Sequence, residues 1–211
     1  MSDPARAVLA LIGVTTLTLA WVSAGLRTDR YDPVRQSISQ LQRDGTATGT
    51  TMSVAFLAFA VGALAVAPVV GRRIARPAQI ALTVAALATL GGAASPLAEV
   101  RGGAQDAVHL TFGTTGYAAV SVLPLLAGWA LRTRSRWGAG LSFLLGAVAS
   151  GCLLATVPAE GVSGALQRAG FLAAHLWLVA FAVVVLVSGS SAPVRGSDLR
   201  GHRRRTSWSP R

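Results

Sequence analysis

The chain has 211 residues, of which 52% are hydrophobic and 13% charged, and its formal net charge at pH 7 is +11. This composition excludes an ordinary soluble domain and predicts a polytopic membrane protein. The basic residues lie in short loops and a tail rather than among aromatic residues on a polar domain, so the charge does not indicate nucleic-acid binding. The single cysteine, Cys152, excludes a disulfide framework within one chain.

Six apolar runs are each long enough to cross a membrane as a helix, which takes about 20 residues. We therefore predict an all-α bundle, residues 1–188, with the first run retained rather than cleaved as a signal sequence. Ser95 and Pro96 are expected to kink the third helix. Residues 189–211, rich in Ser, Gly, Pro and Arg, are predicted to form a disordered basic tail. The predicted spans are 6–26, 50–71, 79–100, 107–131, 138–157 and 169–188.

The arginines are distributed unequally between the two sides of the predicted bundle. Thirteen of the nineteen basic residues fall in the N-terminal segment, the second and fourth loops and the tail. Because positively charged loops stay in the cytoplasm, we expect both termini to be cytoplasmic in a multi-pass protein of the plasma membrane. The tail either binds anionic lipid or only anchors this topology.

The first loop contains a polar segment, Tyr31 to Arg43, with the sequence YDPVRQSISQLQR. Asp32 suits an N-cap and Pro33 suits the first position of a helix. The apolar residues that recur at helical spacing are Val34, Ile38 and Leu41. The pattern predicts a short amphipathic helix that lies in the membrane interface on the outer side.

Ionisable residues gather near the outer ends of three spans. A charge within the bilayer costs several kcal/mol unless it is paired or hydrated, so such residues indicate a site. Glu99 ends the third predicted span, Asp106 and His109 begin the fourth, and His175 lies about 9 Å below the start of the sixth. These positions predict a polar pocket in the outer third of the bundle, covered by the first loop.

Each of these residues also has a purely structural interpretation. Asp106 and His109, three residues apart on one helix face, suit an acid–base pair or two metal ligands, whereas Asp106 also suits a cap of the fourth helix. His175 also suits a hydrogen bond to a neighbouring helix. Gln167 and Arg168 suit a lipid phosphate, whereas an arginine at a helix end often anchors the helix at the interface.

Three motifs resemble a known family. YDPVRQSISQL after the first span, DAVH at the start of the fourth and GALQRAGFLAAHLWLV in the sixth are similar to the bacterial six-span membrane family called domain of unknown function 998. The first motif is also distantly similar to the proline-serine-isoleucine-serine loop of the Frag1/DRAM/Sfk1 group, which is linked to lipid remodelling. The resemblance implies the fold and the place of a site, not an activity, and the chain departs from it at Gln42, where we expect a glycine. By position it marks Tyr31, Pro33, Ser37, Ile38, Ser39, Leu41, His109, Gln167, Arg168 and Trp177.

The preferred function is the binding or handling of a lipid head group in the outer pocket. Arg35 and Arg168 would hold phosphate, and serine and amide side chains would add hydrogen bonds. The expected partners are membrane lipids, with a second copy of the chain or another membrane protein as further possibilities; no cofactor is expected. The predicted ligand-binding residues are Tyr31, Arg35, Ser37, Ser39, Gln167 and Arg168.

Two alternatives remain open. One is an intramembrane hydrolase, in which His109 and His175 with Asp106 or Glu99 hold a metal that activates water, or Ser39 is a nucleophile served by His109. The chain has no HExxH, GxSxG or paired-cysteine motif, so a metal site is not expected. The other alternative is a small transporter or partner subunit, in which His175 and Asp106 relay protons.

Overall fold

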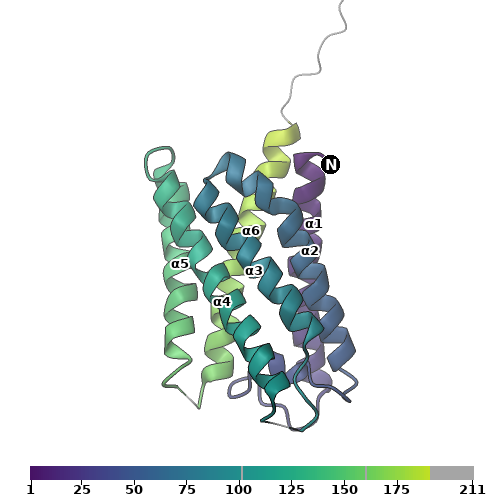
Figure 1. Ribbon diagram of the computed structural model, residues 1–211. Coiled ribbons are helices and arrows are strands. Elements are labelled where there is room, and N and C mark those ends of the chain that lie inside the picture. The colour runs from purple at the N-terminus through teal and green to yellow at the C-terminus, as the bar shows by residue number, and fades with distance from the viewer. Residues whose placement is uncertain (101, 160, 191–211) are drawn as a thin grey trace, which may run out of the picture.

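The computed structural model describes residues 1–100, 102–159 and 161–190. This part of the chain is an all-α bundle of helices with one short 3-10 helix in its first loop (Figure 1). Six helices are long and apolar enough to cross a membrane, which confirms the predicted six-span fold. Most of the predicted tail, 191–211, lies outside the described residues. The elements are α1 Asp3–Arg27, η1 Ile38–Leu41, α2 Gly49–Arg73, α3 Arg76–Ala94, α4 Ala104–Leu131, α5 Arg136–Ala155 and α6 Ser163–Ser190.

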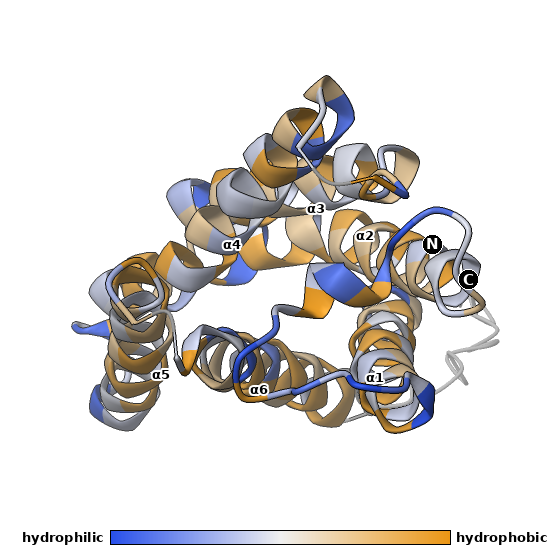
Figure 2. Ribbon diagram, turned by 90° about the horizontal axis from the view of Figure 1, so that it is seen from below, coloured by the Kyte–Doolittle hydropathy of each residue, from blue (hydrophilic) through white to orange (hydrophobic). Residues whose placement is uncertain are grey.

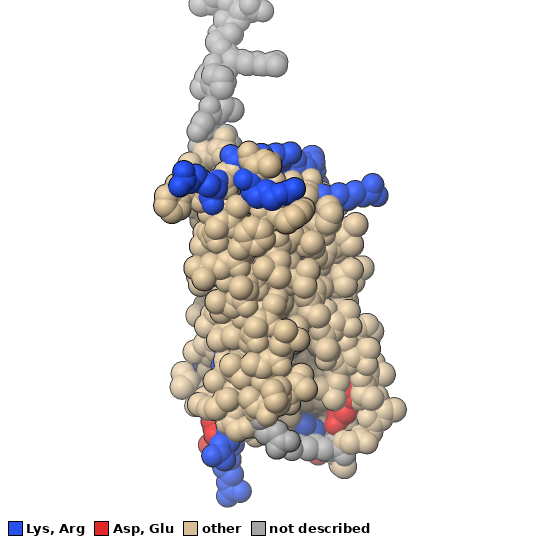
Figure 3. Space-filling model, turned by 90° about the vertical axis from the view of Figure 1, so that its left-hand side faces the viewer, with Lys and Arg blue, Asp and Glu red and all other residues tan. Residues whose placement is uncertain are grey.

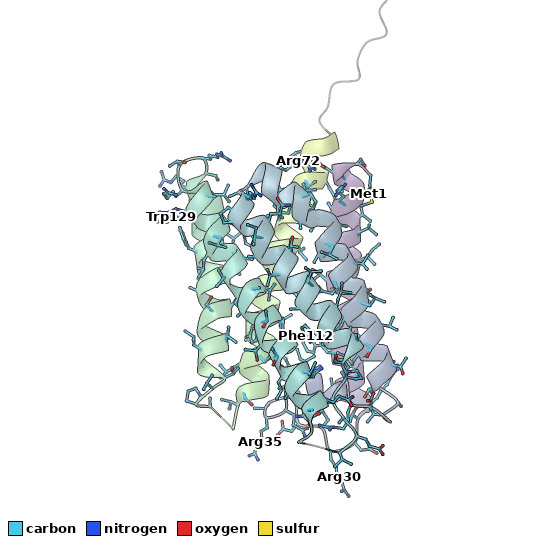
Figure 4. The ribbon with its side chains drawn as sticks, viewed as in Figure 1. Met1, Arg30, Arg35, Arg72, Phe112 and Trp129 are labelled. Atoms are coloured by element: carbon cyan, nitrogen blue, oxygen red, sulfur yellow. The ribbon has the colours of Figure 1, made fainter. Side chains whose placement is uncertain are left out.

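The two ends of the bundle differ in charge. The end that carries the N-terminus and the α2–α3 and α4–α5 turns, here called the arginine end, shows a band of arginines above a belt without charged side chains (Figure 3). Met1, Arg72 and Trp129 mark this end in Figure 4, and Arg30 and Arg35 point away from the opposite end. That opposite end, here called the loop end, carries residues 28–48, 95–100, 102–103, 156–159 and 161–162.

Consecutive helices pack side by side, and α6 closes the ring against α1. Small residues allow the first two helices to cross closely. A Cβ atom at Gly13 would lie 2.7 Å from the carbonyl oxygen of Ala58, and one at Gly62 would lie 2.5 Å from that of Leu9. Close approach of this kind gives the packing contacts that hold helices together where lipid removes the hydrophobic effect. The helix that buries the smallest share of its residues is α5.

The third helix is shorter than predicted. It ends at Ala94, whereas the apolar run suggested residue 100, so Ser95 and Pro96 end the helix rather than kink it. The chain then turns into the first loop: the Asp44 amide donates to the Leu97 carbonyl at 2.8 Å, and the Leu97 amide donates to the Gln42 carbonyl at 3.0 Å. This pairing gives the residues after Pro96 hydrogen-bond partners that a longer helix would exclude.

The first loop contains a short helix, as predicted, but this helix is shorter than the apolar spacing suggested. The Asp32 carboxylate accepts from the Val34 amide at 2.9 Å, which makes one turn, and the helix proper is the four-residue η1. Ile38 and Leu41 are only 3% and 1% exposed, so they pack inside the bundle rather than against lipid. The length and the surroundings of this helix differ from the expectation because spacing alone could not show which apolar surface the loop would cover. Seen from the loop end in Figure 2, the loop crosses the interior of the helix ring.

Candidate functional site

A cavity of about 310 Å³ lies beneath the first loop at the loop end of the bundle. Its wall is formed by η1 and by parts of all six helices. The volume falls at the lower end of the range for small-molecule sites. The predicted site residues that line it are Ser37, Ser39, His109, Gln167 and His175. The structure therefore brings together residues from the loop, α4 and α6 that the sequence analysis had placed in one outer pocket.

The wall of the cavity is polar in places but carries no ionic group. Among the residues that the structure describes, its lining contains no Arg, Asp or Glu. Most of the lining is apolar or aromatic, for example Phe56, Phe59 and Phe171. The site can therefore hold an apolar group and a hydrogen-bonding group, and it offers no counter-ion to a charged one.

Three side chains of the lining have buried polar atoms that find no hydrogen-bond partner among the residues the structure describes. They are Nε1 of Trp21, Oε1 of Gln42 and Nε2 of His175. Such an atom is costly in any protein interior and more so in a bilayer, where water is scarce. All three atoms belong to residues that line the same cavity.

The two histidines are held by separate partners. His109 Nδ1 lies 2.7 Å from the Ser95 carbonyl oxygen, which can only accept, so Nδ1 carries hydrogen and Nε2 of the neutral ring is an acceptor. His175 Nδ1 lies 3.1 Å from Thr18 Oγ1. Because α6 begins at Ser163, His175 lies about 18 Å along its helix rather than the predicted 9 Å.

The arrangements that a hydrolase would need are not formed. Ser39 Oγ lies 2.9 Å from Ser37 Oγ and has no hydrogen bond to a histidine. Asp106 accepts from the backbone amides of Ala98 at 2.8 Å and Gly102 at 2.9 Å, so it organises the loop before α4.

The predicted metal ligands do not converge either. Glu99 is exposed. Within the described ranges no three His, Cys, Asp or Glu side chains are grouped as a metal site. The metal and serine mechanisms therefore lack the constellation on which they depended.

Arg168 holds the first loop rather than lining the cavity. Its Nη1 donates to the carbonyl oxygens of Pro33 at 2.7 Å and Gln36 at 2.9 Å, and its Nη2 donates to the Tyr31 hydroxyl. The guanidinium also lies 5.5 Å from the centre of the Trp21 ring, and the whole side chain is 9% exposed. Its donors are thus turned to the protein, which argues against the predicted contact between Arg168 and a lipid phosphate.

Tyr31 and Arg35, two further predicted ligand-binding residues, also lie outside the lining. The Tyr31 hydroxyl donates to the Ser37 carbonyl at 2.9 Å. Burial raises the pKa of this phenol, and the neighbouring Arg168 offsets part of the increase, so the hydroxyl keeps its proton for that bond. The Arg35 side chain is 75% exposed and pairs with Asp32 at 3.6 Å.

Two glutamines fasten the loop over the cavity. Gln167 Oε1 accepts from the Ile38 amide at 2.7 Å. Gln42 Nε2 donates to Ser53 Oγ at 2.9 Å, to the Gly92 carbonyl at 3.1 Å and to the carbonyl of the next residue at 3.3 Å. The sequence analysis noted Gln42 only as a departure from an expected glycine. A long polar side chain in place of glycine, next to an apolar span, was the signal that could have identified it.

The fold and the cavity together define a multi-pass integral membrane bundle with a ligand-sized site at one end. The chain belongs to the family described as protein of unknown function (DUF998), whose model matches residues 11–184. The match covers most of the bundle and confirms the resemblance drawn from the three motifs. No curated protein and no solved structure matches the chain.

Proposed function

We propose that the protein binds the head group of a membrane lipid in the loop-end cavity. The observation that carries this proposal is the group of buried, unpartnered polar atoms on Trp21, Gln42 and His175 in an otherwise apolar wall. An amphiphile fits such a wall because its head can satisfy these atoms while its apolar part contacts the aromatic residues. Water alone would fill the cavity less favourably, because it gains no hydrogen bonds from the apolar part of the wall.

The unequal distribution of arginine supports a location in the plasma membrane with the loop end outside. The α2–α3 and α4–α5 turns carry Arg72, Arg73, Arg132 and Arg134, and acidic side chains are concentrated at the loop end. By the positive-inside rule the arginine end and both termini are cytoplasmic. The cavity then takes its ligand from the outer leaflet.

Lipid retention tests the binding proposal. The full chain, purified in mild detergent, is examined by native mass spectrometry for bound lipid. Trp21→Phe and His175→Phe remove polar atoms from the wall and keep aromatic rings. Because one hydrogen bond contributes about 1 kcal/mol, we expect each change to lower lipid occupancy about fivefold.

Trp177→Phe is the matched control for this experiment. Its Nε1 donates to Ser142 Oγ at 2.9 Å, and the residue lies outside the cavity lining. We expect the control to retain lipid as the wild type does. A wild-type protein without bound lipid, or an equal loss in the control and in the two cavity variants, would refute the proposal.

Cysteine labelling tests the orientation. With Cys152→Ala as the background, a cysteine is placed at Arg35 in the first loop or at Arg134 in the α4–α5 turn, both of which are exposed. A membrane-impermeant maleimide added to intact cells is expected to label Arg35→Cys only. Labelling of Arg134→Cys alone would show that the orientation is the opposite of the proposed one.

A further inference from the structure

The chemistry of the cavity wall restricts the head group to an uncharged one. Across the described part of the chain, no Arg, Asp or Glu side chain lines the cavity. The guanidinium of Arg168 lies close by, over the Trp21 ring, but its Nη1 donates to three backbone carbonyls. A phosphate or an ammonium group would therefore lose its hydration in this site and gain no counter-ion, which is unfavourable at membrane depth.

The wall offers both kinds of hydrogen-bonding atom. The Trp21 indole can only donate, and Gln42 Oε1 can only accept. Ser37 and Ser39 carry hydroxyls that can do either, and their mutual bond of 2.9 Å uses one hydrogen between them. The simplest group that complements both kinds is a hydroxyl, which donates once and accepts twice.

The size of the cavity requires part of a lipid to remain outside it. A cavity of about 310 Å³ is at the lower end of the range for small-molecule sites. That is enough for a small head group and the first carbons of a chain. A lipid with two acyl chains is several times larger, so its tails must leave the cavity through an opening.

Such an opening lies between the loop-end halves of α4 and α5. Leu110 and Gly113 on α4 line the cavity and are also exposed, with Leu110 57% exposed. Val157, in the turn after α5 at the loop end, also lines the cavity and is 83% exposed. A Cβ atom at Gly113 would have no neighbour within 4 Å. We call this opening the α4–α5 window.

The two helices diverge beyond the bond of 3.3 Å that Ser150 Oγ on α5 donates to the Ser121 carbonyl on α4, and their closest packing lies nearer the arginine end. There the ring of Phe143 packs at Gly128, and Leu125 packs at Gly146. From that region α4 slants away from α5 toward the loop end (Figure 1), and the separation is also seen along the bundle in Figure 2. The flank that α5 faces carries no charge between the two ends (Figure 3), as expected where a chain meets lipid.

The geometry points to a lipid alcohol as the ligand. Its uncharged, hydroxyl-bearing head lies in the cavity, and its acyl tails pass through the α4–α5 window into the bilayer. This inference rests on the proposed function and adds the class of the head group and the path of entry. It also explains why Gly113 suits its position: a larger side chain there would project into the space that the tails occupy.

Photo-crosslinking tests the inference on the full chain in nanodiscs. The probes are dioleoylglycerol and dioleoylphosphatidate, each with a diazirine in one acyl chain, so that they share tails and differ in head-group charge. We expect dioleoylglycerol to crosslink to peptides that contain Leu110 or Val157 at least about tenfold more than dioleoylphosphatidate, because the cavity has no counter-ion.

Gly113→Trp should lower that crosslinking about tenfold, because the indole fills the window. A tenfold change corresponds to a loss of about 1.4 kcal/mol of binding free energy. Gly151→Trp is the matched control, because Gly151 on α5 is also exposed and free of neighbours within 4 Å but does not line the cavity. Both changes replace an exposed helical glycine by tryptophan, which has the higher helix propensity, so both variants should keep their helices.

Three results would overturn the inference. Preference for dioleoylphosphatidate, or equal crosslinking of the two probes, would refute an uncharged head group. An equal effect of Gly113→Trp and Gly151→Trp would refute the window. In each case the proposed function, lipid binding in the cavity, stands if lipid retention still depends on His175. The proposed function itself is refuted if the wild-type protein retains no lipid.

Discussion

Replacement of Arg168 is the most direct test of how the loop is held over the cavity. Arg168→Ala removes the guanidinium that donates to the Pro33 and Gln36 carbonyls and to the Tyr31 hydroxyl. The change leaves the backbone of α6 in place, including the bond of 2.9 Å that the Ala165 amide donates to the Val34 carbonyl. We expect the first loop to detach locally while the six-helix bundle stays folded.

The size of the effect follows from the two carbonyl contacts. Hydrogen bonds from a charged donor contribute about 1.5–3 kcal/mol each, so the lower limit for the bonds to Pro33 and Gln36 is about 3 kcal/mol. The lower limit is appropriate because both acceptors lie near the end of the bundle, where water can replace part of the contact. A loss of about 3 kcal/mol makes local opening about a hundred times more frequent.

Hydrogen exchange measured by mass spectrometry reads out this opening. The peptide that spans residues 31–43 contains the Ile38 amide, which donates to Gln167 Oε1 in the closed loop. In Arg168→Ala its exchange should be about a hundredfold faster, whereas peptides from the centre of α2 should exchange as in the wild type. Arg168→Lys keeps the charge but lacks the planar guanidinium, so the exchange rate of its loop should lie between those of the wild type and Arg168→Ala.

Arg35→Ala is the control for a general effect of removing positive charge from this end. Arg35 pairs only with Asp32 at the surface, and such exposed pairs contribute at most about 1 kcal/mol. Hydrogen exchange of residues 31–43 in Arg35→Ala should match that of the wild type. If Arg168→Ala also leaves exchange of residues 31–43 unchanged, the assignment of Arg168 as the support of the loop is wrong.

Three further substitutions test the packing of the loop and the bundle. Gly164→Ala would place a Cβ atom 2.3 Å from the Gln36 carbonyl oxygen, so loop exchange should rise, with a cost of about 1–3 kcal/mol; unchanged exchange would contradict the contact. Gln42→Leu removes three hydrogen bonds and one unpartnered oxygen, so thermal stability in detergent should fall by about 2 kcal/mol net, and a gain in stability would contradict this balance. Gly62→Leu would clash with the Leu9 carbonyl oxygen at 2.5 Å and should lower the thermal midpoint; an unchanged midpoint would contradict the close crossing of α1 and α2.

The helices were predictable because their apolar runs match the thickness of a bilayer. The end of α3 was not, because the run continues through Leu97 while the backbone beyond Ala94 bonds to the first loop instead. That pairing joins residues about fifty positions apart, which local pattern cannot reveal. The same limit applies to η1, whose apolar residues are buried only because α6 and α3 fasten the loop.

The place of a cavity under the first loop was predictable, but the contacts that each nearby residue makes were not. His109 and His175 stood out because ionisable groups are rare in spans, and both line the cavity. Arg168 stood out for the same reason, yet its charge serves the loop backbone. Trp21 gave no signal that separates it from an ordinary interface tryptophan, because only the folded structure shows that its Nε1 lacks a partner.

The way the loop is fastened indicates where the cavity can open. Gln167 and Arg168 hold the loop to α6, and Gln42 holds it to α3, so lifting the loop would break bonds to both helices. Separation of α4 and α5 beyond the bond from Ser150 Oγ to the Ser121 carbonyl would break few contacts, because Phe143 and Leu125 join these helices closer to the arginine end. A ligand therefore meets less resistance from the side of the bundle than from its end, which agrees with entry of a lipid from the bilayer rather than of a solute from water.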